Sequence, residues 1–581
     1  MTSRSGLASL TLSVSLVLAL AAGLLGALVP GATPAAAAAV APAAPAAAPT
    51  SDRPQAGAQV ARAPVPRLTW GRCDGGGARG GDSGQARTPI GQRISCATAW
   101  VPLDYDRPKG ARTRLALLKV AAARPAQRIG TLFVNPGGPG GPSTQFAPQA
   151  ARLLGSRVAA RFDVVGIDPR GTGGSGEISC RGRVQRAYLP WEYPRTDAET
   201  VTTLRRDGQV RRACRREATA LTDHASTADN ARDMELVRRA LGERRISYYG
   251  ISYGTYLGAT YAAMFPGRVR AMTVDGVLDP VAWSTGPAGP VRTPFSTRLG
   301  SDVGTQEALT AALARCDQVG PARCPLAPGA QQTWDRVVAT AATRPIRFEG
   351  ERINERDIYS FATSLLYDRR TVSLLVRYVA DLDAAIDGRV APGLGALQRR
   401  VREVQRRREE VGPWTWETAS GTGRPAANPA PLRTLGLQPQ AVMCSDSSNP
   451  QQPQAWIRAA AEADRTAPGF GSLWTWLSSI CARQGIGSGA DSYRGPWQTR
   501  TAYPLLVVGN SHDPSTPIHG ARRVHELFAG SRLVTYDGWG HGAIGTGTCI
   551  RRTMAAYLLD RDLPPEGRIC PGGVLFPRPG A

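Results

Sequence analysis

Short apolar runs alternate with helix-like segments through the first half of the chain. The first two runs, 94–101 and 115–121, are typical of opening antiparallel strands. Segment 229–241 is predicted as an amphipathic helix, because its apolar positions repeat at helical spacing and Gly242 follows as a stop signal. The remaining runs predicted as strands are 131–135, 162–167, 246–249 and 271–274. This order predicts a doubly wound, mostly parallel sheet with helices on both faces.

The alternation stops near Pro280 and returns late in the chain. From 281 to 497 the segments are helix-like and separated by loops rich in Gly, Pro and Ser, which predicts a helical cap inserted into the sheet domain. Strand-like runs resume at 505–508 and 532–536. The helix-like segments of the cap are 307–318, 332–343, 355–387, 395–410 and 453–483. The sheet domain is therefore predicted in two parts, 68–280 and 498–581.

The N-terminal stretch before Leu68 has a composition that cannot bury a core. Arg4 precedes a long apolar run and small residues follow it, so 1–39 is predicted as a signal peptide. The alternative is a single membrane anchor, because the apolar run approaches spanning length. The Ala/Pro-rich stretch 40–67 is predicted as a flexible linker or pro-segment. We therefore expect a secreted protein, in solution or associated with the cell wall, whose mature form has no stable membrane span.

Charge and cysteine content narrow the choice of partner and cofactor. The formal charge of +24 would by itself suggest nucleic acid or a membrane surface. The basic residues are scattered, however, and only Lys109 and Lys119 are lysines, so no nucleic-acid partner is expected.

Ten cysteines in an exported chain favour disulfides, and pairing of neighbours along the chain is the simplest of many connectivities. No CxxC or HExxH pattern occurs, so neither a metal nor another cofactor is expected.

The strongest candidate for chemistry is the pentapeptide 250–254, which reads Gly-Ile-Ser-Tyr-Gly. It follows a predicted strand and precedes a helix-like stretch of small residues, which is the context in which a G-x-S-x-G turn lifts a serine hydroxyl clear of a sheet. Both glycines are expected to be required, because a side chain at either position would collide with the neighbouring strand and helix. Ser252 is therefore predicted to be a nucleophile.

An acid and a base follow in the chain order that this turn requires. Asp513 comes after the predicted strand 505–508, and His541 comes after the strand 532–536, which we expect to be the last. Ser252 would attack an acyl carbon, His541 would take the serine proton, and Asp513 would fix the imidazole tautomer. The rival bases are His224, His512, His519 and His525, and the rival acids are Asp275, Asp279 and Asp537.

A glycine-rich loop supplies the predicted oxyanion hole. The run 131–135 ends in Pro-Gly-Gly-Pro-Gly-Gly at 136–141, where free backbone N–H groups can face a ligand. The predicted donors are the backbone N–H groups of Tyr253 and Gly138, with Gly137 as the alternative to Gly138. In the loop after 162–167, Asp168 and Arg170 are interpreted as a structural pair that braces the loop.

Five segments together carry a family resemblance. They are 135–141, 168–175, 250–254, 513–517 and 538–541. In combination they resemble the secreted exopeptidases of the α/β-hydrolase fold that are related to proline iminopeptidase, and the closest similarity is to actinobacterial tripeptidyl aminopeptidases. Proline iminopeptidases open the glycine loop with histidine, whereas this chain has Pro136, which matches the tripeptidyl subgroup better.

The resemblance implies release of short peptides, tripeptides in that subgroup, from free N-termini through an acyl-enzyme. Such an enzyme needs cap carboxylates that hold the substrate ammonium group. Asp446 is the first candidate, although the polar loop around it also fits a surface aspartate, and Glu417 is the second. A secreted carboxylesterase or lipase would use the same triad and is the main alternative. A non-catalytic cell-surface binding protein on a hydrolase scaffold would lack a triad member, and none is missing.

Overall fold

The computed structural model describes residues 52–73, 88, 91–180, 192–289, 291–348, 350–389 and 435–576. All of them belong to one unit that spans residues 49–581. The predicted signal peptide, the cap segment 395–410 and Glu417 lie outside the described residues. Within the described ranges, no helix has both the length and the apolar character that crossing a membrane requires.

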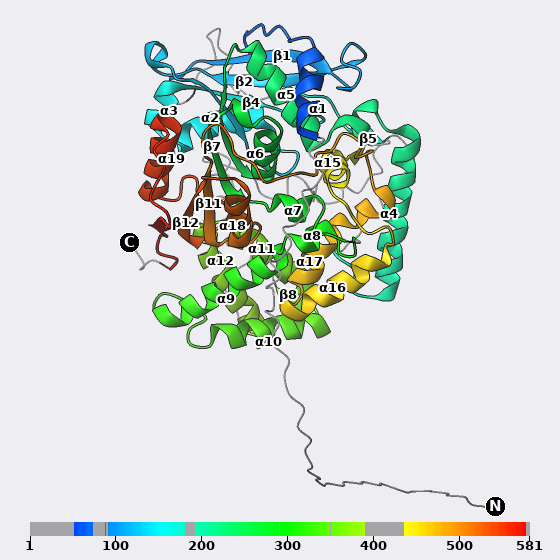
Figure 1. The fold of residues 1–581 in the computed structure, drawn as a ribbon. Helices are drawn as coiled ribbons and strands as arrows, with labels where there is room; N and C mark the ends of the chain where they lie inside the picture. Colours follow the sequence, from blue (N-terminus) through cyan, green and yellow to red (C-terminus); the bar gives the residue numbers. More distant parts are fainter. Residues whose placement is uncertain are drawn as a thin grey trace, which may run out of the picture. The chain divides into compact units, whose positions relative to one another are not determined.

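A nine-stranded sheet forms the centre of the protein (Figure 1). Its first two strands pair antiparallel with each other, and β2 pairs antiparallel with β4, while every later neighbour pair is parallel. The strands in spatial order are β1 (Ile94–Pro102), β2 (Arg112–Val120), β4 (Phe162–Ile167), β3 (Gly130–Asn135), β6 (Ile246–Ser252), β7 (Val269–Val277), β11 (Leu506–His512), β12 (Arg532–Trp539) and β13 (Ile569–Pro571). The predicted doubly wound, mostly parallel sheet is confirmed.

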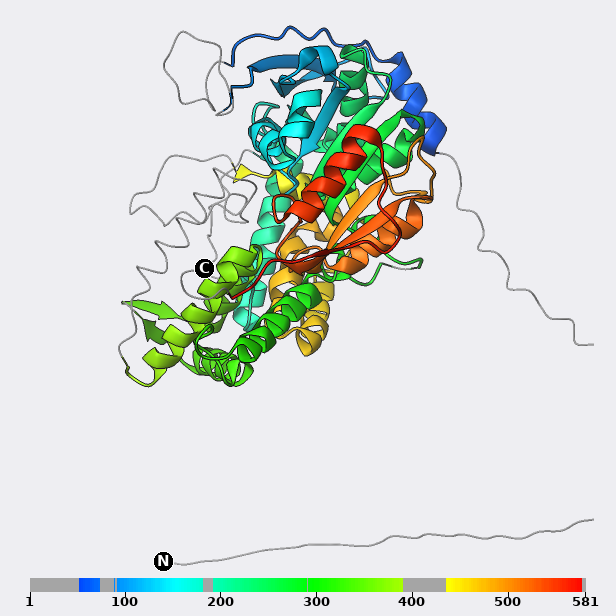
Figure 2. The same cartoon turned by 90° about the vertical axis from the view of Figure 1, so that its left-hand side faces the viewer.

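Helices cover both faces of the sheet. Successive strand residues point to opposite sides, so strands that are apolar throughout give the sheet two apolar faces, and each is buried under helices. On β6, Tyr248 belongs to the core on one face and Tyr249 to the core on the other. The first face is covered by α1 (Asp52–Arg62), α5 (Thr227–Ala240), α6 (Tyr253–Met264) and α18 (Ile518–Leu527). The second is covered by α2 (Ser143–Leu153), α3 (Ser156–Arg161) and α19 (Thr548–Asp560). In Figure 2, α19 is drawn in red in front of the strands.

The cap lies between β7 and β11 in the chain and has a hydrophobic core of its own. Its helical elements are α7 (Pro280–Trp283), α8 (Phe295–Arg298), α9 (Ser301–Val319), α10 (Ala330–Thr343), α11 (Glu355–Leu366), α12 (Arg369–Ile386), α15 (Gln438–Asp446), α16 (Gln454–Thr466), α17 (Phe470–Thr475) and the 3-10 segment η4 (Trp476–Gln484). Figure 1 shows α9 to α12 gathered beside the end of the sheet that carries β11 and β12. The boundaries 281 and 497 stay predictions.

Several short elements differ from the sequence prediction. The segment 355–387 is two helices, because Asp368 ends the first and its carboxylate accepts the Arg370 N–H at the start of the second. The cap contains the strands β8 (Ile346–Phe348) and β9 (Glu351–Ile353), which are too short to show an alternating pattern. A third strand, β10 (Leu435–Gly436), pairs with β5 (Ser179–Cys180). The strand at 532–536 is not the last, because β13 follows it.

The segments that connect these elements include further short helices. They are η1 (Pro125–Gln127), α4 (Asp197–Glu217), η2 (Ala220–His224) and η3 (Pro266–Arg268). Of these, α4 packs against η4 of the cap, and a disulfide joins it to β5. The segment between β5 and α5 therefore contributes to the cap, which the sequence pattern did not indicate.

Of the two alternatives for 40–67, a flexible linker or a pro-segment, the flexible linker does not describe the chain from Asp52 onward. Helix α1 begins there and packs against α5 and α6. Val60 is 2% exposed and belongs to the core cluster of that face. The side chain of Arg239 on α5 donates to the Val60 carbonyl at 2.6 Å. Composition misled the prediction, because the buried Val60 on the helix and Ala63 directly after it are enough to anchor α1 against an existing core.

The cysteines form five disulfides, which use all ten. Each joins neighbours along the chain, so the simplest connectivity is confirmed. The pairs are Cys73–Cys96, Cys180–Cys214, Cys316–Cys324, Cys444–Cys481 and Cys549–Cys570.

Candidate active site

The turn between β6 and α6 holds Ser252 in an unusual backbone conformation. Its φ of 57° and ψ of −129° lie in a region that non-glycine residues rarely occupy, at a cost of about 1–3 kcal/mol. The flanking glycines allow the close packing that this turn needs. A Cβ at Gly250 would lie 2.4 Å from the Gly254 carbonyl oxygen, and a Cβ at Gly254 would lie 2.6 Å from the Asn135 carbonyl oxygen on β3. Both collisions expected from the sequence are therefore present.

Asp513 and His541 meet at the ends of β11 and β12. The Nδ1 atom of His541 lies 2.9 Å from Oδ1 of Asp513 and 3.1 Å from Oδ2. The Asp513 carboxylate also accepts the backbone N–H groups of Ser515, Thr516 and Gly542. Its side chain is fully buried, whereas that of His541 is 10% exposed. The acid is thus held in one orientation, with its charge directed at the imidazole.

Thr516 is a further member of this group that the sequence analysis missed. Its hydroxyl donates to Oδ2 of Asp513 at 3.0 Å and lies 3.1 Å from Nδ1 of His541. The signal was present in the sequence, since a threonine three residues after an aspartate often closes a local turn onto that carboxylate. Here the turn also fixes the acid against the base.

The loop that carries His541 packs against the strand that carries Ser252. A Cβ at Gly542 would meet the Ile251 side chain at 2.4 Å, and a Cβ at Gly276 would lie 3.2 Å from the Gly542 nitrogen. On β7, Asp275 accepts the N–H groups of Ala543 and Ile544 at 2.8 and 2.9 Å. The histidine loop is therefore tied to the ends of both β6 and β7.

The rival acids have other partners. Burial raises the pKa of Asp275 to about 6, and its carboxylate holds the histidine loop rather than the imidazole. Asp279 caps α7 by accepting the N–H groups of Val281 and Ala282. Asp537 accepts from the Ser511 hydroxyl at the surface.

The rival bases also lie elsewhere. His512 stacks on Trp539 with ring centroids 4.2 Å apart. His519 contacts the Leu299 carbonyl, and His525 contacts Ser531. His224 pairs with Asp491 at 2.8 Å, and this hydrogen bond raises the pKa of His224. Among the five histidines, His541 has Asp513 as its partner.

The glycine loop lies directly beside the serine. A Cβ at Gly137 would be 2.9 Å from both the Ser252 Cβ and the Tyr253 nitrogen. The N–H of Gly137 already donates to the Asn135 side chain at 2.9 Å, which favours Gly138 as the loop donor. Tyr253 is the first residue of α6, so its N–H has no acceptor within the helix. This geometry supports the choice of Tyr253 and Gly138, which stays a prediction.

Asp168 and Arg170 do brace their loop, but through different partners. The Asp168 carboxylate accepts the N–H groups of Thr144 and Gly174 at 2.8 and 3.0 Å. The buried guanidinium of Arg170 pairs instead with Asp233 on α5 at 2.7 Å. Asp168 and Arg170 therefore do not form one structural pair, contrary to the interpretation of the sequence, because each binds a different part of the structure.

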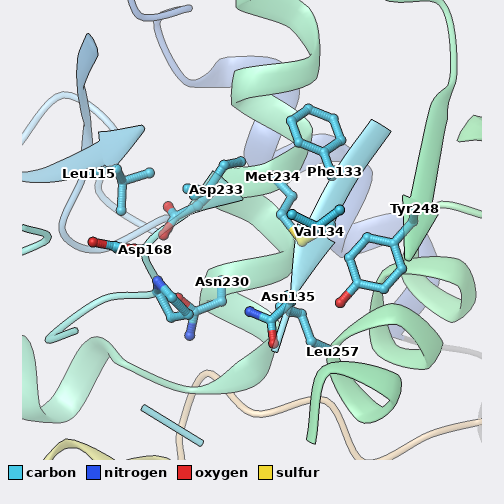
Figure 3. Close-up of a pocket in the computed structure, with 12 residues that line it drawn as sticks. Leu115, Phe133, Val134, Asn135, Asp168, Asn230, Asp233, Met234, Tyr248 and Leu257 are labelled. Atoms are coloured by element: carbon cyan, nitrogen blue, oxygen red, sulfur yellow. The ribbon is translucent and has the colours of Figure 1, made fainter. Parts of the chain in front are cut away.

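A cavity of about 20 Å³ lies near these residues, between the strands and α5 (Figure 3). Its polar lining comes from Asn135, Asp168, Asn230 and Asp233, and Leu115, Met234 and Leu257 are among its apolar neighbours. That volume holds about one water molecule. The cavity can therefore hydrate buried polar groups, but it cannot hold a peptide.

Asp446 lies in the interior, at the end of α15. It is 1% exposed, and its carboxylate accepts the N–H and hydroxyl of Thr227 at 2.9 and 2.6 Å. The Trp283 indole donates more weakly at 3.4 Å. The Thr227 hydroxyl also hydrogen bonds with the hydroxyl of Tyr253, which connects Asp446 to the serine turn. Burial raises the pKa of Asp446 from 3.8 to about 7.

Two family models match the chain. The model described as alpha/beta hydrolase fold matches residues 130–315, which include Ser252. The model described as TAP-like protein matches residues 466–570, which include Asp513 and His541. The two models together span every candidate triad residue.

Named relatives match most of the chain. The tripeptidyl aminopeptidase of Streptomyces lividans is 29% identical and covers 87% of this chain and 88% of its own. The serine protease Hip1 of Mycobacterium tuberculosis H37Rv is 29% identical, with 82% and 87% covered. Carboxylesterase B of the same organism is 30% identical, with 90% and 93% covered. The solved proline iminopeptidase of Mycobacterium smegmatis is 16% identical and covers 80% of this chain and 98% of its own, but its TM-score of 0.30 carries no argument.

Proposed function

The chain belongs to the TAP-like branch of the α/β-hydrolases and is a serine hydrolase, and on this premise we propose that it releases short peptides, in the first place tripeptides, from free N-termini. The observation that carries the proposal is the strained turn at Ser252, which is packed against the loop of a buried Asp513–His541 pair. Strain of this kind persists where the surrounding structure enforces it, most often at functional sites.

In the proposed mechanism, Ser252 attacks the scissile carbonyl carbon. His541 accepts the serine proton and returns it to the leaving amine, while Asp513 orients the imidazole and stabilises its positive charge. The N–H groups of Tyr253 and Gly138 hold the negative oxygen of the tetrahedral intermediate. Water then attacks the acyl-enzyme, with His541 as the base, and releases the peptide.

Asp446 is proposed to bind the ammonium group of the substrate. Among the described residues, no cationic side chain pairs with its carboxylate, and Arg494 contacts the backbone carbonyl instead. Burial is the main cause of the raised pKa of about 7, and no ion pair within the described ranges offsets it. A substrate ammonium group would supply a positive charge, provided that Thr227 and Trp283 make room for it. Glu417 stays a second prediction.

The first experiment compares three substrates on the purified protein. They are a chromogenic Ala-Pro-Ala anilide with a free amine, its N-acetylated form and a short-chain nitrophenyl ester. We expect rapid cleavage of the free peptide and little cleavage of the acetylated one. Equal cleavage of both peptides would contradict the requirement for a free N-terminus.

Two variants connect that result to the site. Ser252→Ala should abolish turnover of all substrates without unfolding the protein, and retained activity would contradict the mechanism. Asp446→Asn should raise KM for the free peptide about tenfold or more, because a hydrogen bond to a charged group contributes about 1.5–3 kcal/mol. Ester hydrolysis serves as the control, since the ester has no ammonium group.

Ester hydrolysis is the second candidate function. It is favoured by the relative named carboxylesterase B, of which the match covers 93%. Esters and amides share the acyl-enzyme route, so the same triad would serve both. Turnover of the nitrophenyl ester with no cleavage of either peptide would keep the serine mechanism and replace the peptidase activity.

We also propose that the protein acts outside the cell. Five disulfides that use every cysteine are typical of oxidising compartments. Recovery of the processed chain from the culture medium or the cell wall, and its absence from the cytoplasm, would support this location.

A further inference from the structure

The cap reaches the catalytic histidine through the turn between α11 and α12. Asp368 in this turn forms an antiparallel bridge with Gly540, the residue before His541. The N–H of His541 donates to the Tyr367 carbonyl at 2.9 Å. A Cβ at Gly540 would lie 3.2 Å from that same carbonyl oxygen, and the φ of 112° at Gly540 suits glycine. The backbone of the base is therefore paired with the backbone of the cap.

The Tyr367 side chain contacts the imidazole as well. Its ring lies edge-to-face with the His541 ring, with centroids 5.1 Å apart and an interplanar angle of 65°. The Nδ1 atom of His541 faces Asp513 and Thr516, so these two groups and the Tyr367 ring together restrict the imidazole. Aromatic pairs of this geometry contribute about 0.5–1.5 kcal/mol beyond their buried area.

The turn is firmly held on its cap side. The Asp368 carboxylate accepts the Arg370 N–H and pairs with the Arg370 guanidinium, and Thr371 donates to the Leu365 carbonyl across the helix junction. The Arg369 guanidinium donates to the Val574 carbonyl at 2.9 Å. A displacement of α11 or α12 would therefore move Tyr367 with it, and the contact with His541 would change.

We propose that Tyr367 is a positioning residue that sets the orientation of His541 according to the seating of the cap. The proposal rests on the triad assigned under the proposed function and adds to it a regulation of the base. When the cap is seated on the histidine loop, the imidazole is fixed between Asp513 and the tyrosine ring. When the cap shifts, the base loses one of its two fixed sides, and proton transfer from Ser252 slows.

The test is Tyr367→Leu, with Tyr367→Phe as the conservative variant that keeps the ring. Tyr378→Leu is the matched control, since Tyr378 is buried in the cap core against Phe361 rather than beside His541. We expect Tyr367→Leu to lower kcat about ten- to a hundredfold with little change in KM, because small misplacements of catalytic groups have effects of that size. Tyr367→Phe should restore kcat, and Tyr378→Leu should lower thermal stability without changing kcat.

The pH profile separates positioning from simple loss of stability. The charged groups around the imidazole are Asp513 from the β11 loop, Asp275 beneath the histidine loop, and the Asp368–Arg370 pair of the cap turn. Removal of the ring opens the imidazole to water without changing these charges, so the acidic limb of the kcat/KM profile should move in Tyr367→Leu alone. A folded Tyr367→Leu with the wild-type kcat and profile would overturn the proposal. If this variant does not fold, kcat and the pH profile are measured on Tyr367→Met instead, with the same expected and contradicting results.

Failure of the positioning role can be distinguished from failure of the proposed function. An inactive Ser252→Ala together with an unaffected Tyr367→Leu would remove the positioning role and leave the serine mechanism intact. An active Ser252→Ala would overturn the mechanism and the positioning role together. An inactive Ser252→Ala, a slow Tyr367→Leu and a restored Tyr367→Phe would support both.

Discussion

The acid loop after β11 and helix α15 of the cap differ in whether their buried polar groups are hydrogen bonded. Each oxygen of Asp513 accepts hydrogen bonds from the backbone, from Thr516 or from His541. In α15 and the residue after it, several buried side-chain atoms have no partner within the described structure. They are Oε1 and Nε2 of Gln438, Oε1 of Gln440, and the hydroxyls of Ser445 and Ser447. We call the acid loop the complete region, because both oxygens of its carboxylate are hydrogen bonded, and α15 the incomplete region, because these atoms have no partner among the described residues.

The difference indicates that the acid loop and α15 have different roles. A satisfied polar network is rigid and holds catalytic groups in place before substrate arrives. Unsatisfied buried groups are costly and uncommon, so their concentration in one helix needs an explanation. This helix lies over the glycine loop, since a Cβ at Gly140 would meet the Gln438 amide oxygen at 2.6 Å. The proposed catalytic acid is thus preorganised, whereas α15 carries unpartnered polar atoms beside the glycine loop.

The largest effect should come from breaking the complete region. Asp513→Asn keeps the shape of the side chain but offers an amide N–H or a neutral oxygen to His541, which favours the wrong tautomer. We expect kcat to fall about 10⁴-fold, equivalent to about 5 kcal/mol, with the fold intact. Steady-state kinetics on the ester and the peptide measure this loss. Asp537→Asn, at an exposed position of β12, is the matched control, and a comparable loss there would contradict the choice of acid.

A smaller effect concerns the ionisation of Asp446 in the incomplete region. Its pKa is raised from 3.8 to about 7, so the folded protein binds this proton more tightly than the unfolded chain does. The contribution to stability is full below pH 3.8 and is lost as pH rises to about 7, a change of at most about 4 kcal/mol. Asp446→Asn should remove this fall, as measured by denaturant unfolding at pH 4, 6 and 8. The same pH dependence in Asp446→Asn and in the exposed Asp562→Asn would contradict the assignment.

The smallest effect should come from repairing the incomplete region. Gln438 is 5% exposed with both amide atoms unpartnered, so Gln438→Met removes two unsatisfied groups and keeps the volume. We expect the free energy of unfolding to rise by about 1–2 kcal/mol. The exposed Gln451→Met should leave it unchanged. A loss of stability in Gln438→Met would show that the amide has a partner and would weaken the contrast between the two regions.

Much of the sheet domain could be predicted because its signals are local. Parallel strands buried on both faces read as apolar runs, and the turn at Ser252 needs glycines within two residues on each side. The order of nucleophile, acid and base along the chain then predicted Asp513 and His541, and the structure brings these two side chains into hydrogen-bonding contact. The pairing of the cysteines also followed from the sequence order, because each pair closes a short local loop.

The failures concern contacts between distant segments. Nothing local shows that α1 docks on α5, or that the turn at Tyr367 reaches His541, because both depend on how separate elements pack. The division of 355–387 into two helices was missed, since the apolar spacing continues across the Asp368 cap. The alternative interpretation of Asp446 as a surface aspartate is wrong, because the serines around it suggest a polar loop but the tertiary structure buries it.

The position of the cap within the chain has a consequence for when activity appears. Strands β7 and β11 are neighbours in the sheet, but all the cap helices from α7 onward are synthesised between them. A growing chain therefore carries the proposed nucleophile long before it carries the proposed acid and base. Pairing of segments so far apart in sequence is among the slower steps of folding. Hydrolysis can begin only after β11 and β12 have joined the sheet, so the onset of turnover reports the completion of folding.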